Sequence, residues 1–392
     1  MPLALYALTI AAYAIGTTEF VIVGLLPTVA TDLGITLPLA GLIVSIYALG
    51  VTFGAPILTA LTGRIERKPL LIGLMALFIA GNTFAALSPS YEMLLVARVL
   101  SAFAHGVFFS VGATIAADLV PENRRASAIA LMFMGLTVAI VTGVPLGTFI
   151  GQTFGWRATF WAVAGLGAVA LAAIALLLPS TLSKAAPASL FDQLRVLGSG
   201  RLLLVFAMTA LGYGGTFVTF TYLAPMLQEV TGFAASSVSL VLVLYGLTIA
   251  AGNIIGGRVA DRDPVKALTV LFAAQAAVLV IFTFTSVSAV PALITLAALG
   301  FLSFANVPGL QLYVVQLAKR HRPGAVDVAS ALNIAAFNLG IAAGAWIGGL
   351  VVASPLGLQA TPWVGAILVS GALVLTVISG MLDRPAVSEA SA

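Results

Sequence analysis

The chain has 392 residues, of which 61% are hydrophobic and only 8% are charged, and its mean hydropathy is +1.16. A soluble domain carries about 25% charged residues, so this composition excludes a soluble protein and indicates a polytopic membrane protein. The net charge is +4, but the chain has no basic run typical of nucleic-acid binding, so we do not expect a nucleic-acid partner. The absence of cysteine excludes disulfides, thiol nucleophiles and Cys-ligated metals.

Apolar runs of about 20 residues, separated by short polar or Gly- and Pro-containing turns, predict an all-α membrane protein with twelve transmembrane helices. The first run has no basic residue before it and is longer than the apolar core of a signal peptide, so we expect a retained helix. The predicted spans are 4–29, 37–60, 69–88, 92–119, 126–150, 159–179, 202–228, 236–259, 266–287, 290–317, 326–351 and 362–381.

Positive charge predicts the orientation of these spans. Fifteen of the 17 Lys and Arg residues lie at junctions on one side, so the positive-inside rule predicts that both termini are cytoplasmic. The longest polar interruption, 181–200, is predicted to be a cytoplasmic linker between two six-helix bundles, 1–180 and 201–384. Residues 385–392 are expected to form a cytoplasmic tail.

Glu19 is the only acid well inside any predicted span. A carboxylate at that depth costs several kcal/mol unless it is protonated or paired, so intramembrane acids are commonly functional. Arg98 and His105 are seven residues apart in span 92–119, close to two helical turns, and they therefore point the same way. We expect these three residues to form a proton-coupling site in which Arg98 is the counter-ion of Glu19.

Each of the three residues also has a structural interpretation. Glu19 would then be a protonated acid bonded within the bundle, and Arg98 an arginine whose head reaches the interface. His105 would be a neutral imidazole bonded to a hydroxyl or a backbone carbonyl.

The two halves repeat at an offset of 198 residues, because the turn Thr59–Arg64 aligns with Gly257–Arg262. At that offset Glu19 maps to Phe217 and Arg98 to Leu296, so proton handling is expected to belong to the first half. In the second half, the candidate substrate-binding residues are Tyr213, Phe217, Asn306, Asn333 and Asn338. The alternative for the aromatic residues is core packing, and for the amides it is hydrogen bonding between helices.

Two glycine stripes predict close helix packing. Gly143, Gly147 and Gly151 are spaced by four, as are Gly340, Gly344 and Gly348, and Pro145 is expected to kink its helix. We expect the stripes to lie at the interfaces between halves that rock against each other in alternating access.

The chain resembles the major facilitator superfamily and, within it, the twelve-helix drug:proton antiporters close to bacterial arabinose-efflux-permease-like proteins. The most specific segment is Gly143–Arg157, which is similar to the antiporter signature of the fifth helix. Arg98, Gly257–Arg262 and Asn338–Gly348 are similar to the fourth-helix, loop and eleventh-helix motifs. The resemblance covers almost all of the chain and implies a fold of two pseudo-symmetric six-helix bundles.

The first-half loop departs from the superfamily pattern, because Gly63 stands at the position of the loop aspartate. We therefore expect Arg64 or Arg67 to pair with Asp118 when that face of the protein is closed. In the second half, Asp261 and Arg262 match the loop motif and are expected to have a conformational role.

The residues predict a proton-coupled secondary transporter of a small organic solute. The resemblance implies that it exports this solute in exchange for protons, and it extends the solute to drug-like compounds, sugars or nucleosides and the function to multidrug resistance. We expect a monomer in the bacterial cytoplasmic (inner) membrane, without cofactor, metal or nucleic-acid partner. A proton symporter or a facilitator for sugars or nucleosides is the alternative within transport, and a non-transporting sensor is the alternative outside it. Because the chain has no HExxH, GxSxG or Walker-type motif, an enzyme or an ATP-driven pump is not expected.

Overall fold

A computed structural model describes residues 2–62, 65–121, 125–179, 196–322 and 326–383. Within these ranges the regular structure is helical, and twelve stretches are long and apolar enough to cross a membrane, as predicted. Most of the predicted linker 181–200 and the whole predicted tail lie outside the described residues.

Within each half the helices follow one another with short connections. The first half comprises α1 Leu3–Leu33, α2 Leu37–Thr62, α3 Arg67–Ala86, α4 Tyr91–Asp118, α5 Arg125–Val138, α6 Val144–Phe154 and α7 Trp156–Leu177. The second half comprises α9 Gly200–Phe220, α10 Leu223–Pro225, α11 Ala235–Ala260, α12 Pro264–Thr285, α13 Ala289–His321, α14 Val326–Ala353 and α15 Thr361–Asp383.

Helix α1 is longer than its predicted span. Its 31 residues rise about 46 Å, whereas a bilayer core is about 30 Å thick, so the helix extends beyond the apolar layer. It ends at Gly34, which adopts the left-handed conformation (φ 63°) that favours glycine at a helix C-terminus. Glu19 therefore lies near the middle of α1.

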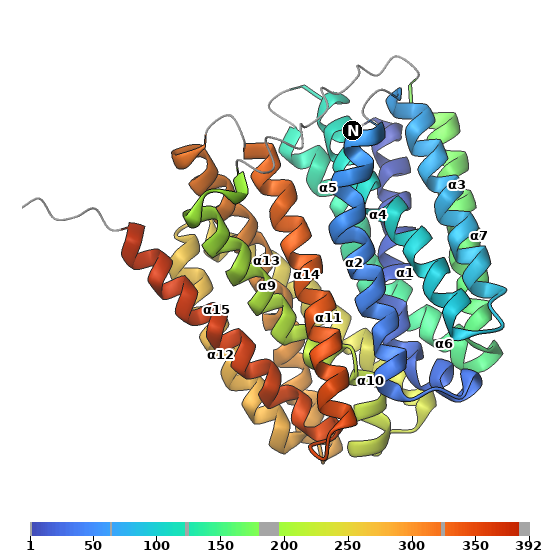
Figure 1. Cartoon of the computed structure of the whole chain (residues 1–392), viewed down its shortest axis with the longest axis vertical. Coiled ribbons are helices and arrows are strands. Elements are labelled where there is room, and N and C mark those ends of the chain that lie inside the picture. The colour runs from blue at the N-terminus through green and yellow to red at the C-terminus, as the bar shows by residue number, and fades with distance from the viewer. Residues whose placement is uncertain (1, 63–64, 122–124, 180–195, 323–325, 384–392) are drawn as a thin grey trace, which may run out of the picture.

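The two halves, α1–α7 and α9–α15, form two bundles that lie side by side (Figure 1). The most extensive contact between them is that of α2 with α14, and smaller contacts join α11 to α6 and α1 to α10. We call the side of the molecule at which α1 and α3 begin the basic face, because Arg67, Lys68, Arg201, Lys319 and Arg320 lie there.

Two spans contain irregular turns that the hydropathy pattern did not predict. A π-helical turn, Ala139–Gly143, separates α5 from α6, and Pro145 is the second residue of α6. Pro145 has no N–H to donate within a helix, and a π turn directly before it is one way a helix accommodates that loss. The span of α9 is interrupted after Phe220, and a second π-helical turn, Met226–Val230, follows α10.

The glycine stripes mediate close packing, but the prediction that they lie between the halves was wrong. A Cβ at Gly143 would lie 2.3 Å from Thr17 Oγ1, and one at Gly147 would lie 2.5 Å from Val21 Cγ2, so the first stripe packs against α1. A Cβ at Gly344 would lie 2.2 Å from the carbonyl oxygen of Gly214 on α9, in the same half. Four-residue spacing predicts close approach of two backbones, but it does not identify the partner helix.

Candidate functional site

Glu19 lies on a face of α1 that packs tightly within the first half. Its side chain is only 8% exposed, and the neighbouring Thr18 is fully buried. A Cβ at Gly16 would lie 2.7 Å from Leu136 Cδ1 on α5, so the small residue allows α5 to approach α1 one turn before the carboxylate. The carboxylate is therefore held inside the bundle rather than at a loop.

His105 is the basic residue closest to the Glu19 carboxylate. Its Nδ1 lies 3.9 Å from Glu19 Oε2, and the two side chains are 7% and 8% exposed. The same Nδ1 lies 3.1 Å from the hydroxyl of Tyr47, a buried residue of α2. The structure thus brings together the predicted Glu19 and His105, and it adds Tyr47.

Arg98 does not make the carboxylate ion pair that the sequence predicted. Its Nη1 donates to the Thr18 carbonyl oxygen at 2.8 Å and to Thr18 Oγ1 at 3.2 Å, and its Nη2 lies 3.5 Å from the Glu19 carbonyl oxygen. The guanidinium also covers the Tyr47 ring, with Cζ 4.0 Å from the ring centroid. Its Nη1 and Nη2 groups thus face oxygens of α1, its buried Nε has no partner among the described residues, and Arg98 acts on the Glu19 carboxylate by Coulombic attraction.

Thr18 links helix α3 to this arrangement. Its hydroxyl donates to Asn82 Oδ1 at 2.6 Å, and Asn82 Nδ2 donates to the Phe78 carbonyl oxygen on α3 at 2.8 Å. Both Thr18 and Asn82 are fully buried, so these bonds satisfy polar groups that would be costly in hydrocarbon. Helices α1, α3 and α4 are therefore fixed to one another beside Glu19.

Sequence reasoning missed Tyr47, Thr18 and Asn82. An aromatic residue in an apolar run most often packs in a core, and the signal that could have identified Tyr47 is its hydroxyl, which needs a partner when it is buried. Asn82 carried a similar signal as the only amide of its span.

The predicted aromatic residues of α9 reach α1 through Phe217. Phe217 and Phe20 have ring centroids 6.3 Å apart, and Phe20 follows Glu19 in the chain. Tyr213 lies 5.3 Å from Phe217 and 4.9 Å from Phe337 of α14. An aromatic cluster therefore bridges the two halves next to Glu19.

The three candidate amides differ in how they are bonded. Asn333 accepts from Thr209 Oγ1 at 2.7 Å and donates to Gln311 Oε1 at 2.9 Å. Asn306 donates to Gln275 Oε1 at 3.0 Å, so both residues bond to neighbouring helices. Asn338 donates only to the Ile334 carbonyl oxygen of its own helix, and its buried Oδ1 has no partner among the described residues. Substrate contact stays a prediction for all three, and Asn306 and Asn338 each have a buried Oδ1 without a partner among the described residues.

On the basic face, Arg67 of α3 forms an ion pair with Asp118 of α4, with Arg67 Nη1 2.5 Å from Asp118 Oδ2. Arg64 lies outside the described residues, so the pair involves the other predicted candidate. In the second half, Asp261 and Arg262 are exposed in the α11–α12 turn. Asp263 caps α12 by accepting from the Lys266 N–H at 3.0 Å, and this hydrogen bond lowers the pKa of its carboxyl group.

Asp118→Asn should weaken the Arg67 contact and change the balance between conformations open to either face. The Arg67 side chain is 6% exposed and that of Asp118 is 34% exposed, so the population change should be at least the roughly fivefold change that corresponds to about 1 kcal/mol for an exposed pair. The measurement is the distance distribution between spin labels on the two halves at the basic face, which the cysteine-free chain makes straightforward. Asp263→Asn, on the same face, is the control. Identical distributions for Asp118→Asn and the unmodified protein would contradict a conformational role for this pair.

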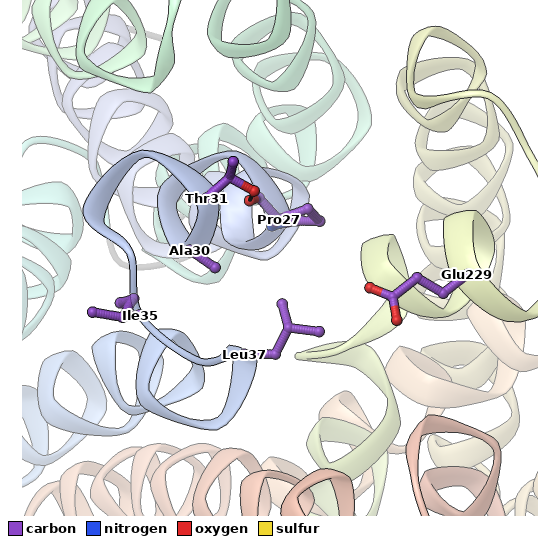
Figure 2. Close-up of a pocket in the computed structure, with 6 residues that line it drawn as sticks. All are labelled: Pro27, Ala30, Thr31, Ile35, Leu37 and Glu229. Atoms are coloured by element: carbon purple, nitrogen blue, oxygen red, sulfur yellow. Dashed lines mark hydrogen bonds between the residues drawn. The ribbon is translucent and has the colours of Figure 1, made fainter.

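The face opposite the basic face carries a pocket of about 240 Å³ that bridges the two halves. Figure 2 shows Glu229 of the second half on one side of it, facing the end of α1 and the start of α2. Thr31 in its wall is twelve residues from Glu19 along α1, about 18 Å. The pocket thus marks the seam between the halves, and it is separate from the Glu19 site.

Comparison with known proteins places this geometry in context. The profile of the Major Facilitator Superfamily matches residues 8–328. The chain is 58% identical over 351 residues to the Uncharacterized MFS-type transporter YtbD of Bacillus subtilis, covering 90% of this chain and 89% of that one. It is 37% identical over 352 residues to a Chloramphenicol resistance protein of Streptomyces lividans, covering 88% of each.

A solved structure supports the fold. The chain resembles a bacterial homologue of the human lysosomal transporter Spinster, in an inward-facing and unoccupied conformation, with a TM-score of 0.70. The match covers 96% of this chain and 95% of the other at 17% sequence identity.

Proposed function

This chain belongs to the major facilitator superfamily, and we propose that it exports a small organic solute in exchange for protons by alternating access. The observation that carries the proposal is the buried Glu19 carboxylate with His105 Nδ1 3.9 Å from its Oε2. Because an intramembrane acid is costly, it is commonly retained for a function, and a carboxylate beside an imidazole can take up and release a proton.

Several features support export of an organic solute. The aromatic cluster of Phe20, Tyr213 and Phe217 offers apolar contact area beside Glu19, and Asn338 offers a free acceptor. The Streptomyces lividans relative carries the name of a drug-resistance protein. We assign the solute to the class of drug-like compounds, sugars and nucleosides.

The positive-inside rule supports an orientation in which the basic face and both termini are cytoplasmic. In that orientation α1 begins in the cytoplasm, and Glu19 is reached from either side as the two bundles rock about the α2–α14 contact. We propose that the protein works as a monomer in the bacterial cytoplasmic membrane.

Proteoliposomes containing the purified protein and an internal pH indicator test the proposal. A thermal-shift screen of drugs, sugars and nucleosides first supplies a solute that binds. When that solute is placed on one side, antiport should drive protons in the direction opposite to solute movement. Proton movement in the same direction would indicate a symporter, and solute movement without a pH change would indicate a facilitator.

Asn338→Ala should weaken solute binding by about 3- to 10-fold, because it removes one buried hydrogen-bond acceptor. The pH dependence of transport should be retained, since an amide does not titrate. Asn333→Ala is the matched control, because both ends of that amide bond to other helices and its loss should lower thermal stability rather than affinity. Equal affinities for Asn338→Ala and the unmodified protein would remove Asn338 from the binding site.

A further inference from the structure

Nδ1 of His105 has two potential partners and can serve only one of them at a time. Tyr47 Oη lies 3.1 Å away, within hydrogen-bonding distance, and Glu19 Oε2 lies 3.9 Å away, beyond it. An imidazole nitrogen has either one lone pair or one proton, so a hydrogen bond to Tyr47 excludes an equally good one to Glu19. In the structure, His105 Nδ1 is hydrogen-bonded to the Tyr47 hydroxyl.

Tyr47 is itself held firmly in place. It is 1% exposed, and the Arg98 guanidinium covers its ring with Cζ 4.0 Å from the centroid. The Nη1 and Nη2 atoms of that guanidinium face the backbone oxygens of Thr18 and Glu19. The ring is thus held against α4 by Arg98, which is itself bonded to the turn of α1 that carries the carboxylate, and its hydroxyl lies next to His105.

The titratable and charged groups facing this site come from four helices. They are Glu19 on α1, Tyr47 on α2, Arg98 and His105 on α4, and Tyr213 on α9, which interacts electrostatically with Glu19. Helix α3 contributes the neutral Asn82. Within the described part of the chain, competition for His105 Nδ1 therefore involves one acid and one phenol.

We propose that Tyr47 is a positioning residue that competes with Glu19 for Nδ1 of His105 and so sets the pH at which Glu19 exchanges its proton. This inference rests on the proposed proton coupling by Glu19. When Glu19 is ionised, the Tyr47 hydroxyl donates to Nδ1. When Glu19 takes up a proton on Oε2, that O–H donates to Nδ1 and displaces the phenol. The imidazole keeps its own proton on Nε2 throughout, so Oε2–H is the only bond that forms or breaks.

Tyr47→Phe removes the competing hydroxyl and keeps the ring under Arg98. Protonated Glu19 then holds Nδ1 without competition, so the pH profile of transport should move by about 0.5–1 pH unit toward alkaline values. Tyr245→Phe is the control, because it removes another buried hydroxyl, the one 3.2 Å from Ser303 Oγ, without touching His105. Its pH profile should coincide with that of the unmodified protein.

A second readout does not depend on transport. The chain has two histidines, and His321 is exposed at the end of α13, so His321→Gln leaves His105 as the single ¹⁵N-histidine signal in labelled protein. In this background Nδ1 should stay unprotonated across the pH range in which transport titrates, and its resonance should change with pH as the donor changes. In Tyr47→Phe the midpoint of that change should move by the same 0.5–1 unit, and in Glu19→Gln the change should disappear.

The outcomes distinguish the competition for His105 Nδ1 from the proposed proton coupling by Glu19. A protonated Nδ1, or a midpoint unaffected by Tyr47→Phe, would overturn the competition even if Glu19 couples transport to protons. The expected ¹⁵N behaviour in a protein whose transport ignores pH would support the competition and remove the proposed function.

Discussion

Glu19→Gln should reduce proton-driven transport to the rate of empty liposomes, while solute exchange without a pH gradient continues. Glutamine has nearly the same size and cannot ionise, so the variant fixes the site in a state resembling protonated Glu19. Folding should be preserved, because the closest basic partner of the Glu19 carboxylate is His105 at 3.9 Å and no short ion pair is lost. The measurement is solute flux in proteoliposomes with and without an imposed pH gradient.

The matched control is Glu92→Gln, which makes the same chemical change in an exposed acid of the first turn of α4. It should leave the gradient-driven rate unchanged. Normal gradient-driven transport by a monodisperse Glu19→Gln protein would refute Glu19 as the proton site and with it the central part of the proposed function.

Gly256→Ala should destabilise the second half by about 1–3 kcal/mol or prevent isolation of a monodisperse protein. The added Cβ would lie 2.0 Å from the Ala305 carbonyl oxygen, which belongs to the backbone of α13 and cannot rotate away. Gly252 faces Phe301 in the same way at 1.9 Å, so the two glycines set the separation of α11 and α13. The measurement is the unfolding midpoint in detergent.

Gly257→Ala, one residue further along α11, is the control. A Cβ there would meet its nearest atom, Pro308 Cβ, at 3.7 Å, which is ordinary van der Waals contact. Both variants make the same change in helix propensity, so the difference between their midpoints isolates the steric clash. Equal midpoints would show that α11 and α13 can separate at little cost.

Hydropathy was sufficient to predict the spans, because the thickness of a bilayer imposes a length that few other constraints override. Hydropathy did not predict the π-helical turn Ala139–Gly143, because such a turn does not change the pattern of apolar residues. Four-residue glycine spacing predicted close packing for Gly147 and Gly344 but not their partners, since spacing records only that two backbones approach.

The site was predictable to the extent that its members are expensive in a membrane. Glu19 and His105 were found because charge and imidazole are rare inside spans, and the structure brings them together. The partner of Arg98 could not be predicted, because a backbone carbonyl has no signature in sequence. Tyr47 was missed because its importance comes from its position between Arg98 and His105, which only tertiary packing reveals.

The backbone bonds of Arg98 have an electrical consequence for the proposed exchange. A guanidinium stays charged, and its bonds to α1 keep that charge at the site whether or not Glu19 carries a proton. Glu19 alone then decides whether the pair is neutral or carries one positive charge. Exchange of one proton for an uncharged solute would move one elementary charge across the membrane, about 2.3 kcal/mol per 100 mV. Membrane voltage would therefore drive export of neutral solutes and leave export of monovalent cations unaffected.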